Sequence, residues 1–115
     1  MPNALANKSK KREKELKARE IALKSEIYNK CSLIKAHKMV FFQNKLDFSA
    51  ALPGQYPLLA KFEEKLQNAE LLEKKPLRRD TVFEIYTKLN RIERELCSIL
   101  VQANIYPKEY LYERD

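Results

Sequence analysis

One stretch of the sequence, residues 81–103, constrains the fold more than any other. Its apolar residues recur at alternating spacings of three and four, at Val82, Ile85, Leu89, Ile92, Leu96, Ile99 and Ala103. This alternation is typical of an α-helix whose apolar side packs along another helix. Thr81 and Glu84 match a capping box at its start, and Asn104 followed by Pro107 predicts its end. We therefore expect a helix here, with the whole apolar set in the core.

The composition favours long helices over β-structure. With one glycine and no tryptophan in 115 residues, the chain has few positions suited to the turns of β-hairpins. The length suits a single domain, and 44% apolar residues suffice for a modest core. Further helices are expected over about 8–42 and 57–73, separated by a proline-containing loop. We predict an all-α, antiparallel, coiled-coil-like three-helix bundle with a long basic first helix and a short C-terminal tail.

The first helix is expected to change character along its length. Residues 10–21 are strong helix formers with opposite charges three and four apart. Further on, Ile27, Ile34 and Phe41 recur every seven residues, and neighbouring apolar side chains widen the apolar surface around the helix. Such a helix lies at the centre of a bundle or contacts both its own chain and another. The chain thus divides into a basic, projecting or partly disordered helical arm (1–20, frayed over 1–9), a bundle (21–104) and an aromatic tail (105–115).

Positive charge is concentrated in the first third of the chain. Residues 1–45 carry 12 Lys and Arg against 4 Glu, although the net charge of the whole chain is +7. Such asymmetry indicates an acidic partner, whether nucleic acid, an anionic membrane or an acidic protein. The candidate contact residues for nucleic acid or an acidic partner are Lys8, Lys10, Lys11, Arg12, Lys14, Lys17, Arg19 and Lys24.

Lysines also recur every seven residues along this part of the chain, at Lys10, Lys17, Lys24, Lys38 and Lys45, with Cys31 at the position between Lys24 and Lys38. A row of this kind could follow phosphates, but the flanking charges of a helical pair are the interpretation we favour. The basic turn at 74–79 would add a second patch only if it lay beside the arm.

Little in the sequence supports catalysis. His37 is the only side chain whose unperturbed pKa lies near neutrality, and a structural role is far more common for such an isolated histidine. Cys31 and Cys97 lie among apolar residues, where cysteine behaves as a small hydrophobe. We therefore expect no catalytic residues, no metal site and no cofactor, and we do not expect an enzyme.

The leading hypothesis is a non-enzymatic protein–protein interaction module, an adaptor or complex subunit. It would bind a protein partner, or itself, through its first and third helices. The candidate interface residues are Leu16, Ile21, Leu23, Tyr28, Phe42, Tyr110 and Tyr112. The alternative is a nucleic-acid-binding accessory protein that contacts phosphates through the basic arm. Adsorption to an anionic membrane is a weaker third hypothesis, because the basic segment lacks a strong apolar face.

No apolar run long enough for a transmembrane helix is present, and no apolar signal core follows the basic N-terminus. We expect an intracellular protein, cytoplasmic or, in a eukaryotic or viral source, nuclear.

Overall fold

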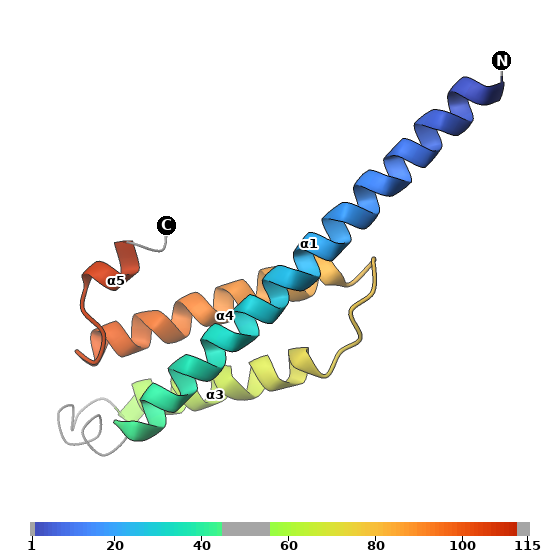
Figure 1. Cartoon of the computed structure of the whole chain (residues 1–115). Coiled ribbons are helices and arrows are strands. Elements are labelled where there is room, and N and C mark those ends of the chain that lie inside the picture. The colour runs from blue at the N-terminus through green and yellow to red at the C-terminus, as the bar shows by residue number, and fades with distance from the viewer. Residues whose placement is uncertain (1, 45–55, 113–115) are drawn as a thin grey trace.

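The chain folds as an all-α three-helix bundle. The computed structural model describes residues 2–44 and 56–112, and this part of the chain contains helices and no strands. The helices are α1 (Pro2–Gln43), α3 (Tyr56–Glu73), α4 (Val82–Gln102) and the single turn α5 (Glu109–Tyr112). The first three pack against one another (Figure 1), which confirms the predicted architecture.

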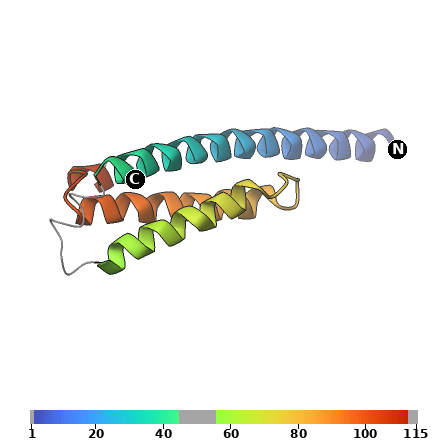
Figure 2. The ribbon, with the colours of Figure 1, turned by 90° about the horizontal axis from the view of Figure 1, so that it is seen from below.

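The bundle runs up, down and up, so α1 and α4 are parallel while α3 is antiparallel to both. Figure 2 shows α1 along one side, with α3 and α4 next to each other beneath it. The N-terminal part of α1 projects beyond the turn that joins α3 to α4 (Figure 1), and the described molecule measures 73 × 29 × 18 Å. A helix as long as α1 spans roughly 60 Å, which accounts for this elongated shape.

The core follows the predicted apolar faces closely. Ile27, Ile34 and Phe41 of α1 are all buried, as the sevenfold spacing predicted. Phe41 stacks on Phe62 of α3 with ring centroids 4.1 Å apart, so two large side chains fill the space near the end of α1. The apolar face of α3 is also buried and consists of Leu59, Phe62, Leu66, Ala69 and Leu72.

For one residue of the apolar set predicted on α4, the expected position in the core is wrong. Leu89 and Leu96 are fully buried, but Ile92 is only partly buried, and the neighbouring Glu93 occupies the core instead. Glu93 contacts side chains of α1, whereas Ile92 lies beside Leu71 and Leu72 of α3. Because α4 packs against two helices, its buried face is wider than a two-helix seam and turns toward α1 at this level.

The predicted end of α4 is observed, whereas the capping box predicted at its start is not. Asn104 takes a left-handed conformation (φ 60°), and the next amides, of Ile105 and Tyr106, donate to the carbonyl of Leu100, which ends the helix. The capping box predicted at Thr81 does not form. The hydroxyl of Thr81 instead accepts from the amide of Arg78 and contacts carbonyl oxygens of the preceding turn.

The first helix begins earlier than expected. Residues 2–9, for which we expected a frayed end, belong to α1, and a proline at the first helical position suits that start. α3 begins one residue before the predicted range and ends at Glu73 as predicted. The loop between α1 and α3 lies outside the described residues from 45 to 55.

Candidate interaction surface

The face of α1 that packs on the bundle has a continuous spacing of three and four. We call it the inner face, and it consists of Leu16, Glu20, Leu23, Ile27, Lys30, Ile34, His37 and Phe41. Its three polar members all have partners on the adjoining elements. Glu20 pairs with Arg79 of the turn before α4 (Nε–Oε2 3.5 Å), and both Lys30 and His37 contact Glu93 of α4. These pairs fix one register of α1 against α4, because a shift of one turn would bury a charge without its partner.

The buried part of this arrangement is a cluster centred on Glu93. The Nε2 atom of His37 lies 2.9 Å from Oε2 of Glu93, and its Nδ1 lies 2.9 Å from the hydroxyl of Tyr106. Nζ of Lys30 approaches Oε1 of Glu93 at 3.7 Å from the edge of the core. His37 is 1% exposed and Glu93 is 0% exposed, so the cluster is enclosed by the apolar core. No buried polar side-chain atom of the described residues lacks a hydrogen-bond partner.

This geometry suits positioning better than chemistry. A general base has to reach a proton of a substrate, and a nucleophile has to be exposed to one. His37 and Glu93 do not line the cleft at Leu16 and Val82, the groove at Leu71 and Ile92, or the cleft at Tyr28 and Leu77. A neutral imidazole protonated at Nε2 would donate to the carboxylate and accept from the tyrosine hydroxyl, so it would satisfy both neighbours. The cluster therefore serves to hold α1, α4 and the segment after α4 together.

Neither thiol is poised for reaction or for metal binding. Burial raises the pKa of Cys31 to about 11, with a further contribution from the nearby Glu73 carboxylate. Burial also raises the pKa of Cys97. Among residues 2–44 and 56–112, no group of three or more His, Cys, Asp or Glu side chains is arranged to hold a metal ion.

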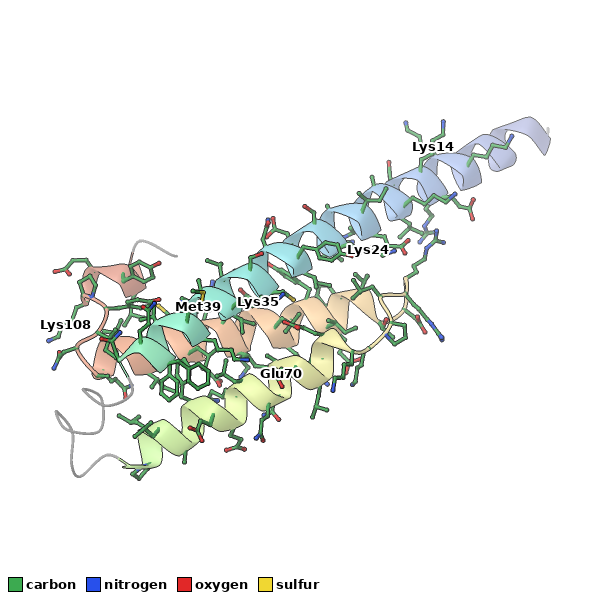
Figure 3. All side chains as sticks on the ribbon, turned by 60° about the horizontal axis from the view of Figure 1, so that its bottom comes forward. Lys14, Lys24, Lys35, Met39, Glu70 and Lys108 are labelled. Carbon is green, nitrogen blue, oxygen red and sulfur yellow. The ribbon has the colours of Figure 1, made fainter. Side chains whose placement is uncertain are left out.

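Beside a cleft that Tyr28 and Lys35 line together with Leu72, Glu73 and Leu77, a second, exposed apolar row runs along α1. We call it the outer face and define it by Ile21, Tyr28 and Met39, which are 68, 66 and 63% exposed. Residues seven and eleven apart lie on the same side of a helix, so the three form one row, which Ser25, Ser32 and Lys35 complete. Figure 3 labels Lys35 and Met39 of this row. Phe42 lies at the end of this row and is half exposed; its ring contacts Phe41 and lies under the ammonium of Lys38.

The predicted row of lysines lies along one edge of the outer face. Lys17 is exposed, whereas Lys24 and Lys38 are partly covered by intrachain ion pairs. Lys24 pairs with Glu20 and Lys38 with Glu70 of α3, each at 3.3 Å (Figure 3). The opposite edge of the row is formed by the small, exposed residues Ala22, Asn29 and Ala36. Over residues 21–39, one edge of the outer face thus carries lysines and the other carries small, uncharged residues, with Glu15 seven residues before Ala22.

The basic arm is exposed as predicted from its sequence. Lys10, Lys11, Arg12, Lys14, Lys17 and Arg19 all face solvent. The turn between α3 and α4 reaches only the base of this arm, where Arg79 meets Glu20, so residues 10–15 project beyond it (Figure 1). Leu16 and Leu23 face the bundle here. They line a cleft of about 300 Å³ together with Val82 and Phe83, and Leu23 also packs against the core.

The remaining predicted interface residues lie at the other end of the molecule or outside its described part. Tyr110 of α5 is partly buried and packs on Tyr106 with ring centroids 4.7 Å apart, which ties the tail to the bundle. The side chains of Lys8 and Tyr112 lie outside the described residues.

A separate apolar groove of about 510 Å³ runs between α3 and α4. Leu71, Leu72 and Ile92 lie in it, and Lys75, Lys88 and Arg91 form its rim. Leu71 is as exposed as the outer-face residues of α1. This makes Leu71 a matched position for testing whether the outer face is special.

Comparison of the chain with protein-family models, curated proteins and solved structures gives no match. Within the described residues, no helix combines the length and apolar character needed to cross a bilayer.

Proposed function

We propose that the protein is a non-enzymatic assembly module that docks a helix of another protein on the outer face of α1. The observation that carries this proposal is the exposure of Ile21, Tyr28 and Met39 in one row on a helix whose opposite side already forms a well-packed core. Large apolar residues scattered singly over a surface are ordinary, but a row at helical spacing is the surface that a second helix needs.

The physical advantage of docking is the burial of this row. Each large apolar side chain that is removed from water contributes about 1.5–3 kcal/mol, before the costs of association are subtracted. The inner-face contacts of α1 hold the row in place before a partner arrives, so little order has to be imposed on this protein. A preorganised helix face of this kind suits an adaptor or a complex subunit.

The decisive experiment places a photo-crosslinking amino acid at position 28 in cells that make the protein. Position 71 on α3, which is similarly exposed but lies in the groove between α3 and α4, receives the same group as a control. We expect a discrete protein adduct from position 28 that disappears when Met39→Glu is added. No adduct from position 28, or the same adduct from position 71, would argue against the proposal.

A second candidate function, nucleic-acid binding through the arm, rests on the exposure and projection of residues 10–15. Contacts to phosphates would release counterions and give strong salt dependence with little sequence preference. The test compares wild type with a Lys10→Gln, Lys11→Gln, Lys14→Gln variant against duplex and single-stranded nucleic acid over a salt series. Steep salt dependence lost in the variant would support this function; equal binding by both proteins would exclude it.

A further inference from the structure

The chemistry of the outer face also defines the kind of helix that fits it. We infer that the outer face of α1 takes an acidic amphipathic helix from another protein, not a second copy of this chain. This inference rests on the proposed function and adds the charge and shape of the partner.

The charge of the outer face is one-sided. Along the row, Lys14 and Lys35 occupy positions at heptad spacing with Ile21, Tyr28 and Phe42, and no acidic residue lies in the row itself. The lysine edge adds Lys17, Lys24 and Lys38. Two of these lysines are paired with Glu20 and Glu70, but both pairs are at the surface. Exposed pairs of this kind are weak, so a carboxylate on an approaching helix can compete for the lysines.

A second copy of α1 fits this surface poorly in either orientation. In a parallel pair, Lys35 would face Lys35 of the other copy and Lys14 would face its counterpart, both within the apolar row. In an antiparallel pair, the same edge of each helix faces the other, so Lys17, Lys24 and Lys38 would meet lysines. Like charges across a helical interface suppress a pairing, whereas an acidic edge would turn the same lysines into favourable contacts.

The small side chains of the outer face indicate where large side chains of the partner would fit. Between Ile21, Tyr28 and Met39 the row is filled by Ser25 and Ser32, and Ala22, Asn29 and Ala36 form the uncharged edge. These small side chains leave space above them that large apolar residues of the partner would fill. The expected partner helix therefore carries large residues at its heptad positions and Asp or Glu along one edge. From Lys14 to Phe42 the row is roughly 40 Å long, which corresponds to about eight turns of helix.

The test uses two helical peptides of about 28 residues with leucine at the heptad positions. They differ only at their edge positions, which carry glutamate in one peptide and lysine in the other. Binding to the full chain is followed by fluorescence anisotropy at low and at physiological salt. Three proteins are compared: wild type, a Tyr28→Asp, Met39→Asp variant, and a Lys17→Glu, Lys24→Glu, Lys38→Glu variant, each checked for wild-type helicity by circular dichroism.

We expect wild type to bind the glutamate peptide at least tenfold more tightly than the lysine peptide at low salt. Charge reversal should invert this preference, and the Tyr28→Asp, Met39→Asp variant should bind neither peptide. Equal binding of both peptides to wild type, abolished by the apolar substitutions, would overturn the acidic partner while leaving the docking function intact.

The remaining alternative is that a second copy of this chain occupies the outer face, and a measurement of self-association tests it. We expect the wild-type chain to sediment as a monomer at about 100 μM, a concentration at which a helical dimer of micromolar affinity would be evident. A dimer that Tyr28→Asp dissociates would overturn the inference in favour of a second copy. Failure of both peptides to bind wild type would overturn it as well, and the crosslinking result from position 28 would then decide the docking function independently.

Discussion

The Nε2 atom of His37 lies 2.9 Å from Oε2 of Glu93, and this contact joins α1 to α4 inside the apolar core. The two residues are 56 positions apart in the sequence, and both are removed from solvent. A buried carboxylate is costly unless it is paired and hydrogen-bonded. Here Lys30 and His37 supply that compensation from α1. The register of the two helices and the charge balance of the core therefore depend on the same carboxylate.

The first prediction is that Glu93→Ala destabilises the fold by about 3 kcal/mol or more. The substitution leaves His37 and the partly buried Lys30 without their acceptor and opens a cavity beside them. Urea denaturation followed by circular dichroism measures the change. Glu84→Ala is the control, because Glu84 forms an exposed pair with Lys88 on the same helix and its loss should cost far less stability. Equal losses in the two variants would contradict the role assigned to Glu93.

The second prediction concerns the coupling of the pair. We expect the double variant His37→Leu, Glu93→Leu to be more stable than Glu93→Leu alone, because the double variant leaves neither polar group buried without its main partner. A double-mutant cycle in urea should give a coupling of about 1–3 kcal/mol. Additive effects of the two substitutions would show that the contact does not contribute to stability.

The third prediction compares Leu89 with Ile92, two positions of α4 that the apolar pattern of the sequence treats as equivalent. Leu89 is fully enclosed, whereas Ile92 borders an open groove between α3 and α4. Leu89→Ala should cost about 3 kcal/mol, and Ile92→Ala about 1 kcal/mol, since its site retains contact with water. The two midpoints of thermal or urea unfolding provide the measurement. A larger loss at Ile92 would restore the simple heptad register that places it in the core.

The fold was predictable because the helices of this chain have strong, local signals. The spacing of Ile27, Ile34 and Phe41 and that of Leu89 and Leu96 identified the buried faces correctly. The predicted burial of Ile92 was wrong because the alternating pattern assumes one neighbouring helix, whereas α4 packs against two. The capping box predicted at Thr81 was wrong because a hydroxyl can form hydrogen bonds with the preceding turn as readily as with the start of the helix. The sequence does not distinguish these two geometries.

The polar cluster was missed although part of its signal is present in the sequence. His37 is three residues after Ile34 and four before Phe41, which places it on the same helix face as both. Glu93 is likewise four residues after Leu89. Counting only apolar residues concealed these positions, and the contribution of Tyr106 depends on the turn after α4, which no periodicity predicts. The outer face was only partly predicted: Ile21 and Tyr28 were recognised, whereas Met39 was not.

The fourth prediction is that Cys31 reacts slowly while the protein is folded. A rise in its pKa from 9.0 to about 11 lowers the thiolate fraction near pH 8 by about a hundredfold. Alkylation by iodoacetamide in a Cys97→Ala background should be slower in the native protein than in urea by at least this order. Because the folded pKa is the higher one, the associated stability is present below about pH 9 and is lost as the pH rises through 11. Equal rates in the folded and unfolded protein would contradict the burial of this thiol.

The last prediction concerns the hydroxyl of Tyr106, which lies 2.9 Å from Nδ1 of His37. We expect this contact to help hold the tail on the bundle. Tyr106→Phe keeps the edge-on contact of the two rings, whose centroids are 5.5 Å apart, and removes the hydrogen bond. We expect a loss of about 1 kcal/mol at neutral pH. Burial raises the pKa of Tyr106, so its contribution is complete below pH 10 and is lost as the pH rises through the folded value. The stability of Tyr106→Phe should therefore fall less steeply than that of wild type above pH 10. Parallel pH profiles for the two proteins would show that the phenol is not desolvated in the native state.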